Sequence, residues 1–399
     1  MARKPSEHIV LTRITLTDFL SYGPGATVVD LEALNVLIGP NGSGKSNLVE
    51  ALAVLRAVPR DLPLPIRQGG GVEEWIWRSG SSRATEAAIE VLFAPGLVRR
   101  GPKVPPVGYR LLFGSEGGSF VVLDERIEDE NGSPKPYFYF GYEGGRPMIN
   151  VAGGKARQLK RAQIDRTQSI LSQRRDPENY PEVAAVGDLL AGILIYRSWS
   201  FGPDAPIRAA CRADVQTDRL LEDFSNLPAR LAVLKREPAT KRKLLERLSD
   251  LAPGYTDIEV APEGGRLQLY VTEGDRNVPA HRLSDGTLRY LTLLAILLDP
   301  GAARLIVIEE PELGLHPDVF PTLRDLLVEA SSRVQVVVTT HSTQLVDAMT
   351  DLARSVVVCE KRGATSVVSR LSQDEVDRWR QFGSLGNLWM SGRLGGTRW

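Results

Sequence analysis

The sequence predicts an α/β fold whose centre is a mostly parallel β-sheet. Two observations lead to this prediction. The apolar run Leu34–Ile38 passes through a glycine-rich loop into a helical pattern over Lys45–Ala57. Between residues 267 and 369, short apolar runs alternate with amphipathic helical segments. Such alternation is typical of a parallel sheet covered by helices on both faces.

The first 150 residues read as strands interrupted by one helix. Strand patterns cover residues 9–16, 28–31, 34–38 and 87–93, and the helix over 45–57 stops before Pro59. Residues 95–150 are rich in Gly, Pro and aromatic residues, with strand-like pieces at Tyr109–Phe113 and Tyr137–Gly141. This composition predicts hairpins at an antiparallel β edge.

The rest of the chain is first helical and then α/β. Residues 155–250 are mostly helical in pattern, including a short amphipathic helix over 240–248. Beyond them the pattern predicts the following elements: strands at 267–271, 305–308, 334–338, 356–360 and 366–369, and helices at 287–298 and 317–330. We therefore expect a discontinuous nucleotide-binding core, 1–95 and 255–399, with residues 96–254 inserted as a β edge and a mainly helical lobe.

Composition narrows the class of protein. The chain has 399 residues, of which 42% are apolar, and its 49 basic and 49 acidic residues cancel, so any contact with nucleic acid must come from local patches. Cys211 and Cys359 lie far apart and lack metal-ligand spacing, which favours buried thiols in a reducing compartment. The N-terminus lacks a signal-peptide pattern, and the most apolar stretch, Leu291–Leu298, is too short to span a bilayer. We expect a cytoplasmic protein with no membrane part.

The glycine-rich loop matches the pattern G-x-x-x-x-G-K-[ST]. It follows a buried strand and opens a helix, which is the context a phosphate-binding loop requires. Lys45 is expected to contact the β- and γ-phosphates, and the Ser46 hydroxyl is expected to bind Mg²⁺. The alternative is a glycine turn that contains a lysine by chance. The predicted nucleotide contacts are Gly39, Pro40, Asn41, Gly42, Ser43, Gly44, Lys45, Ser46 and Asn47.

A second pattern is the apolar strand Leu305–Ile308 that runs into two carboxylates. Adjacent carboxylates at the end of a buried strand are costly unless a cation is nearby. Glu309 is assigned to the metal and Glu310 to the general base that polarises the attacking water. The alternative is a pair of solvated glutamates in a turn.

Two further positions complete the candidate site. His341 follows the strand 334–338 and is expected beside the acidic strand end, as a contact to the γ-phosphate. Ser284 precedes a strong helix, together with Asp285, Gly286 and Thr287. The plain interpretation of Ser284 is a helix N-cap. The functional interpretation uses the same free N–H groups to bind phosphate, which for one nucleotide requires two chains.

In this order, the phosphate loop, serine motif, acidic strand and histidine strand resemble the ABC ATPases, and among them the RecF/SMC-like and OLD-like ATPases often described as AAA-type. The resemblance covers roughly residues 8–95 and 255–399 and implies an ABC-type head that binds ATP and Mg²⁺. It also implies a homodimer in which Ser284 and Gly286, with Asp285 and Thr287, cap the γ-phosphate held by the other subunit. Glu310 would be the catalytic base and His341 the switch histidine.

The departures from the family pattern are informative. The serine motif reads LSDGT rather than the LSGGQ of transporters, and Glu309 stands where transporters have Asp. The segment after His341 is expected to be too short for the Toprim nuclease domain of OLD-like proteins. The C-terminal residues resemble the ending of stand-alone ATPases that lie beside effector or nuclease partners, some in phage defence. The resemblance also implies a glutamine that contacts Mg²⁺, with Gln173 as the candidate, Gln163 and Gln168 as rivals, and a surface glutamine as the plain alternative.

Basic side chains gather in two places. The first cluster is a candidate track for duplex DNA, in which phosphate contacts would not depend on base sequence; a solvated charged face is the alternative. Its assigned residues are Lys155, Arg157, Lys160, Arg161, Arg174 and Arg175. The second cluster comprises Lys235, Arg236, Lys241, Arg242, Lys243 and Arg247.

The leading hypothesis is an ATPase that dimerises on ATP and acts in DNA repair or phage defence with a partner effector. The alternative is a scaffold that uses ATP to change shape and recruit an effector protein, with little turnover. A third hypothesis, the energy subunit of a membrane transporter, is disfavoured by the serine motif and the basic insertion.

Overall fold

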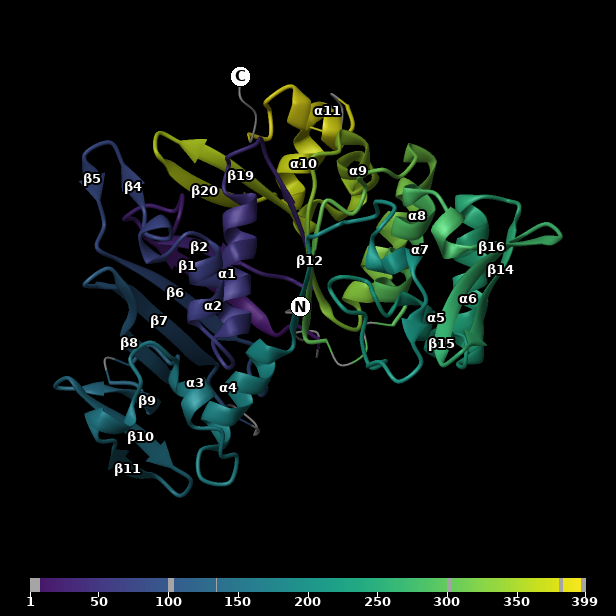
Figure 1. The fold of residues 1–399 in the computed structure, drawn as a ribbon. Coiled ribbons are helices and arrows are strands. Elements are labelled where there is room, and N and C mark those ends of the chain that lie inside the picture. Colours follow the sequence, from purple (N-terminus) through teal and green to yellow (C-terminus); the bar gives the residue numbers. More distant parts are fainter. Residues whose placement is uncertain are drawn as a thin grey trace. The chain divides into compact units, whose positions relative to one another are not determined.

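The computed structural model (Figure 1) describes residues 8–99, 104–133, 135–299, 301, 303–379 and 383–395. The chain divides into two units. The first falls within Met1–Ile193, Arg354–Ser372 and Ser391–Trp399, and the second within Leu194–Ala353 and Gln373–Met390.

An eight-stranded antiparallel sheet dominates the first unit, with strand order β11-β10-β9-β8-β7-β6-β1-β2. Buried and exposed residues alternate along β7, as expected for a sheet with one face on the core. The β7–β8 and β9–β10 hairpins turn on paired glycines with positive φ, Gly117-Gly118 and Gly144-Gly145. The strands are β1 (Leu11–Thr17), β2 (Thr27–Asp30), β6 (Glu86–Phe93), β7 (Val107–Glu116), β8 (Ser119–Asp129), β9 (Phe138–Glu143), β10 (Arg146–Val151) and β11 (Lys155–Gln158).

A second sheet in this unit carries the phosphate loop. Strand β3 (Leu34–Ile38) is buried along its whole length and pairs in parallel with β19 (Val356–Arg362), with Val36 opposite Val356. Strand β20 (Thr365–Arg370) pairs antiparallel with β19. The loop after β3 leads into α1 (Lys45–Ala57). The other elements here are α2 (Pro63–Gln68), η1 (Val72–Glu74), the β4 (Arg78–Ser79) and β5 (Ser82–Arg83) hairpin, η2 (Arg161–Gln163), α3 (Ile170–Gln173) and α4 (Pro181–Ala191).

Parallel strands also form the centre of the second unit. Strands β17 (Leu305–Glu309) and β18 (Gln335–Thr339) are parallel, with Glu309 opposite Thr339, and β12 (Ile193–Tyr196) is the neighbour of β17. Because parallel strands end at the same edge, this register places the residues after β17 beside those after β18. The helices are α5 (Leu227–Leu234), α6 (Pro238–Leu251), α7 (Asp285–Leu297), α8 (Phe320–Ser331), α9 (Thr343–Ala348), α10 (Gln373–Trp379) and α11 (Leu385–Met390), and the 3-10 turns are η3 (Pro206–Arg208), η4 (Ala280–Arg282), η5 (Pro317–Val319) and η6 (Thr350–Ser355).

A small antiparallel sheet completes the second unit. Strand β15 (Arg266–Glu273) pairs with β13 (Cys211–Arg212), β14 (Tyr255–Glu263) and β16 (Arg276–Pro279). Helices α5 and α6 pack against β14, and both also contact α7. After β16, the chain passes through the single turn η4 into the start of α7.

The C-terminal helix α11 packs against α9. The N–H of Gly386 donates to the Asp347 carboxylate over 2.5 Å. A Cβ atom at Gly386 would overlap the Thr343 carbonyl oxygen, so only glycine permits this close approach. Since α9 begins two residues after His341, the C-terminal segment supports the region that follows the histidine.

The predicted α/β fold is confirmed, and two elements have the predicted bounds, Leu34–Ile38 and Lys45–Ala57. The antiparallel part is a full eight-stranded sheet. None of the helices among the described residues combines the length and apolar composition that a membrane span requires.

Candidate nucleotide-binding and catalytic site

The loop between β3 and α1 has the shape of a phosphate cradle. Gly39, Gly42 and Gly44 have φ values of +148°, +78° and +105°. A side chain on Gly39 would overlap the Cys359 carbonyl oxygen of β19, and one on Gly44 would lie 2.6 Å from the Ser366 Oγ atom of β20. Glycine is therefore required both for the backbone conformation and for the space around it.

Polar groups of the loop are suited to an anion. Lys45 is only 5% exposed, and its Nζ atom donates to the Gly39 and Pro40 carbonyls over 2.6 and 3.1 Å. The buried Ser43 hydroxyl meets no hydrogen-bond partner among the described residues. Backbone N–H groups at the start of α1 add positive potential. A buried hydroxyl without a partner beside a helix N-terminus fits a phosphate, and the exposed Ser46 hydroxyl fits a metal ligand.

Residues outside the motif hold the start of α1 in place. The Ser21 Oγ atom accepts hydrogen bonds from the Asn47 amide and the Ser366 hydroxyl, each over 2.7 Å. The fully buried Tyr22 hydroxyl donates to the Gly44 carbonyl over 2.9 Å. The sequence analysis gave Ser21, Tyr22 and Ser366 no role. Their contacts join segments far apart in the chain, so local patterns carry no signal for them.

The acidic strand end places a carboxylate beside the histidine. Glu310 follows β17 with a φ of +47°, and its N–H donates to the Thr339 carbonyl over 2.9 Å. The Oε1 atom of Glu310 lies 3.5 Å from Nε2 of His341, and both side chains are about one-third exposed. The structure thus brings together these two predicted catalytic residues, within reach of a water molecule at the surface.

Glu312 is a site residue that sequence reasoning missed. It is 6% exposed, and its Oε1 atom accepts hydrogen bonds from the Thr340 hydroxyl over 2.5 Å and from the His341 N–H over 3.2 Å. Burial raises the pKa of the Glu312 carboxyl, and the hydrogen bonds from Thr340 and His341 oppose that shift. Its effect is to fix the turn that carries His341.

The serine motif forms the start of α7. The Ser284 Oγ atom accepts a hydrogen bond from the Thr287 N–H over 3.1 Å and lies 2.8 Å from the Thr287 hydroxyl oxygen. Ser284 and Asp285 are exposed, and a side chain on Gly286 would lie 2.8 Å from the Gly314 carbonyl oxygen. The N-cap interpretation is therefore realised, with an exposed hydroxyl at a helix N-terminus.

One of the predicted metal ligands, Gln173, is engaged in local hydrogen bonds. Gln173 donates to the carbonyls of Asp165, Gln168 and Ser169 and accepts from the Asp165 N–H, so its amide is engaged in its own turn. Gln168 contacts Asp61 and the Leu62 N–H instead. Over the described residues, no three His, Cys, Asp or Glu side chains form a metal cluster. Mg²⁺ at a phosphate loop needs only one or two protein ligands, and a hydroxyl such as that of Ser46 is a suitable one.

The first basic cluster is partly engaged in contacts within the protein. Lys155 and Arg157 are exposed on the edge strand β11, and Lys160 and Arg175 are exposed as well. Arg174 donates to the carbonyls of Gln173 and Gln163. The side chain of Arg161 lies outside the described residues.

Ion pairs occupy half of the second basic cluster. Lys235 pairs with Asp257, Lys243 with Glu329, and Arg247 with Asp250. This cluster therefore leaves fewer free cations for a phosphate backbone than its sequence indicates.

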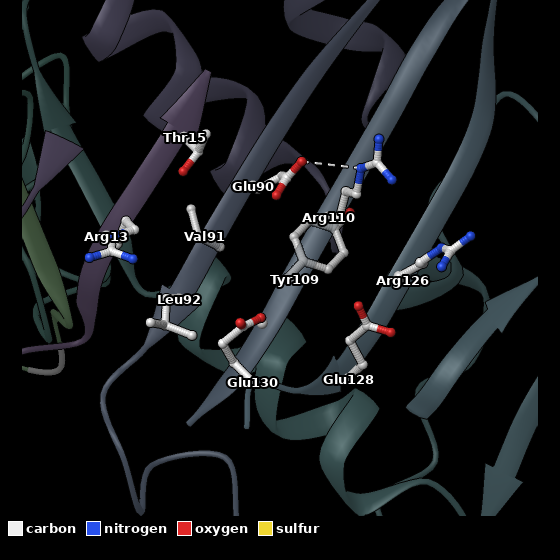
Figure 2. A pocket seen from close by; sticks show the side chains of 11 residues that line it. Arg13, Thr15, Glu90, Val91, Leu92, Tyr109, Arg110, Arg126, Glu128 and Glu130 are labelled. Atoms are coloured by element: carbon white, nitrogen blue, oxygen red, sulfur yellow. Dashed lines mark ion pairs between the residues drawn. The ribbon is translucent and has the colours of Figure 1, made fainter. Parts of the chain in front are cut away.

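A shallow pocket of about 190 Å³ lies on the eight-stranded sheet, over β1, β6, β7 and β8 (Figure 2). Its charges have both signs, and each of its arginines is paired: Arg110 lies 3.2 Å from the Glu90 carboxylate, while Arg13 and Arg126 pair with Asp30 and Asp124 outside the pocket. It contains none of the predicted site residues, and this mixed, paired lining indicates no ligand class.

The chain is similar to known ATPase families. The model of the family described as "AAA domain, putative AbiEii toxin, Type IV TA system" matches residues 34–103 and 207–347, just over half of the chain. The chromosome partition protein Smc of Mycobacterium leprae is 27% identical over 321 residues, covering 77% of this chain and 22% of that protein. The DNA replication and repair protein RecF of Acidothermus cellulolyticus is 50% identical over 64 residues, 15% of this chain and 17% of that protein. The chain thus spans about a fifth of the length of each of these two relatives.

Solved structures confirm the fold. A Smc head bound to the C-winged helix domain of ScpA aligns with a TM-score of 0.56 at 16% identity, covering 92% of this chain and 99% of that one. A Smc head from Pyrococcus furiosus, with an extended coiled coil and bound to the C-terminal domain of ScpA, aligns with a TM-score of 0.55 at 16% identity. The alignment covers 94% of this chain and 99% of that one. The predicted resemblance is confirmed: the chain belongs to the AAA domain family described as putative AbiEii toxin, within the ABC- and SMC-like P-loop ATPases.

Proposed function

We propose that this chain binds ATP with Mg²⁺ and hydrolyses it, working as a pair of identical subunits. The observation that carries the proposal is the cradle after β3, where glycine is required at Gly39 and Gly44 and the buried Ser43 hydroxyl has no partner among the described residues. Such a cradle suits a triphosphate because its donors are fixed before the ligand arrives.

Each candidate residue then has one role. Lys45 exchanges its loop carbonyls for the β- and γ-phosphates, which are better acceptors because they are charged. Ser46 and Glu309 would hold Mg²⁺, which would offset the charge that develops on the phosphates. Glu310 takes the proton of the attacking water. His341, whose turn is fixed by Glu312, donates from its ring toward the γ-phosphate. Gln173 remains a candidate metal contact if its turn opens.

Pairing of two chains follows from the start of α7. Ser284 and Asp285 are exposed, and the α7 N-terminus offers N–H groups to an external acceptor. In the proposed dimer, Ser284, Asp285, Gly286 and Thr287 of one chain cap the γ-phosphate bound by the other. The division into a core, 1–95 and 255–399, and an insertion, 96–254, belongs to the same proposal.

The biological setting is proposed from relatives. The RecF relative is named for DNA replication and repair, and the family description names a putative toxin. We propose a role in DNA repair or phage defence, in the cytoplasm, with a partner effector. Exposed Lys155, Arg157, Lys160 and Arg175, with Arg161 and Arg174, are the proposed contacts to duplex DNA.

Two of the Smc heads among the solved relatives are bound to ScpA, which favours a second candidate, a scaffold that recruits a partner with little turnover. One experiment tests both. Light scattering of Glu310→Gln is measured with and without ATP–Mg²⁺, beside hydrolysis by the unaltered protein and by Lys45→Ala. A trapped dimer, with turnover that Lys45→Ala abolishes, supports the ATPase. A Glu310→Gln protein that stays monomeric in saturating ATP contradicts the dimer, and negligible turnover supports the scaffold.

A further inference from the structure

The backbone of the proposed base, Glu310, is held in an uncommon conformation. Its φ of +47° lies in the left-handed region, which residues with a side chain seldom occupy. Such conformations persist only where surrounding contacts determine them. One of these contacts is the hydrogen bond from the Glu310 N–H to the Thr339 carbonyl.

The Leu313 N–H donates to the Glu310 carbonyl over 3.2 Å, and two side chains from distant parts of the sequence supply further contacts. The indole N–H of Trp199 donates to the Glu309 carbonyl over 2.6 Å. The Nη1 atom of Arg289 donates to the Glu310 carbonyl over 3.2 Å and to the Leu313 carbonyl over 2.5 Å. Every acceptor is a main-chain carbonyl, so these side chains fix the path of the chain around Glu310 rather than its carboxylate.

The side chains of Trp199 and Arg289 also contact each other. The Arg289 guanidinium lies 4.5 Å from the centre of the Trp199 ring and 5.5 Å from that of Phe201. Behind it, the Trp199 ring stacks on Phe224 with centroids 5.2 Å apart. Arg289 is 6% exposed, and this burial lowers its pKa, so the aromatic faces partly replace the water that the cation has lost.

The same aromatic segment reaches the serine motif. Arg208 donates through Nε to the Phe201 carbonyl over 2.7 Å and through Nη1 to the Leu283 carbonyl over 2.8 Å, and it pairs with Asp285. Segment 199–201 is thus bonded on one side to the end of β17 and on the other to the loop that ends at Ser284. Arg289 itself lies on α7, in the helix that Ser284 caps.

We propose that Trp199 and Arg289 are positioning residues for hydrolysis: together they set the backbone of Glu310 and tie it to the start of α7. This inference rests on the proposed ATPase function and adds to it a physical link between the serine motif and the base of the same chain. In a dimer, the link would make the position of Glu310 sensitive to whether Ser284 has engaged the other nucleotide.

The test measures kcat, KM and nucleotide affinity for Trp199→Phe, Arg289→Lys and the double variant. Phenylalanine keeps the ring but lacks the N–H donor, and lysine lacks the planar fork that stacks on a ring and spans two carbonyls. We expect each single variant to lower kcat about tenfold while ATP affinity stays within about twofold. Because the two residues act as one unit, the double variant should match Arg289→Lys alone.

Matched controls separate positioning from general loss of packing. Trp75→Phe alters a buried indole whose N–H meets no acceptor among the described residues. Arg230→Lys alters a buried guanidinium that also donates to main-chain carbonyls, those of Thr217 and Asp299. Both controls should keep the unaltered kcat.

Three results would overturn the inference: unaltered kcat in Trp199→Phe, equal losses in ATP affinity and kcat, or additive losses in the double variant. These results differ from failure of the proposed function. If the unaltered protein binds ATP but does not hydrolyse it, the proposed ATPase function is refuted, and with it any role of Trp199 and Arg289 in hydrolysis. If both the unaltered protein and Trp199→Phe hydrolyse ATP at the same rate, only the proposed positioning role of Trp199 and Arg289 is refuted.

Discussion

The Nε2 atom of His341 lies 3.5 Å from the Oε1 atom of Glu310, at the ends of two neighbouring parallel strands. Neither residue is near the other in sequence, and the register of β17 and β18 alone brings them together. The pair has the two components of a hydrolytic site, a carboxylate that accepts a proton and a ring that donates one.

The first prediction concerns this histidine. His341→Ala should lower kcat for ATP hydrolysis by about a hundredfold with little change in ATP affinity, because the ring acts on the transition state rather than on binding. Steady-state hydrolysis and equilibrium binding of a fluorescent ATP analogue measure the two effects. His8→Ala, at an exposed position near the N-terminus, is the control and should behave as the unaltered protein. Equal loss of binding and turnover would show that His341 is a structural residue.

The phosphate loop makes a prediction about stability. Gly39→Ala should cost roughly 3 kcal/mol or more of the unfolding free energy and abolish ATP binding, because the backbone is left-handed and the new methyl would overlap the Cys359 carbonyl. Urea unfolding and ATP-binding measurements test this. Gly25→Ala is the control, since a Cβ at Gly25 meets nothing within 4 Å. A stable, ATP-binding Gly39→Ala protein would refute the described loop geometry.

Glu312 should affect both stability and hydrolysis, because it fixes the turn that carries His341. Glu312→Ala removes the acceptor of the Thr340 hydroxyl and the His341 N–H, and we expect a loss of about 3 kcal/mol in stability together with slower hydrolysis. Glu312→Gln keeps a carbonyl oxygen at the same place and should retain most of both. Thermal melts and hydrolysis rates distinguish the two variants. Similar behaviour of Ala and Gln would show that the hydrogen bonds are unimportant.

A buried carboxylate in the first unit predicts a dependence of stability on pH. Glu125 is 2% exposed and accepts hydrogen bonds from the Tyr109 hydroxyl, the Ser169 hydroxyl and the Ile170 N–H. Burial raises its pKa from 4.5 to about 7. The folded protein therefore binds this proton more tightly than the unfolded chain, so the stabilisation is complete below pH 4.5 and disappears as pH rises through 7.

On this basis, Glu125 should make the protein about 3 kcal/mol less stable at pH 8 than at pH 5. Glu125→Gln cannot ionise and should lose this difference. Urea unfolding at both pH values measures it, and Glu143→Gln, on the exposed end of β9, should keep it. An unchanged pH difference in Glu125→Gln would assign the effect to another group.

The sequence predicted best those features that depend on neighbouring residues. Strand β3 and helix α1 have the predicted ends because a mostly apolar run, a glycine loop and a proline mark them locally. The Gly-, Pro- and aromatic-rich composition of residues 95–150 indicated hairpins, but it did not indicate that eight strands join one sheet. Strand order depends on pairing between distant segments, which no local pattern records.

The residues missed in the site share one property: each acts on a partner far along the chain. Trp199 and Glu309 are separated by 110 residues, and Arg289 and Leu313 by 24. One signal was available. Arg289 is the only charge in the otherwise apolar helical stretch from Leu288 to Leu298, and a cation in a fully buried helix must have a dedicated set of acceptors.

The close packing of Gly386 against Thr343 has a practical consequence for anyone who handles this protein. Helix α11 is hydrogen-bonded to α9, and α9 begins two residues after His341, capped by Ser342. A label attached at position 386 would overlap the Thr343 carbonyl and displace α11 from α9. Crosslinkers and dyes are therefore better attached away from the contact between these two helices.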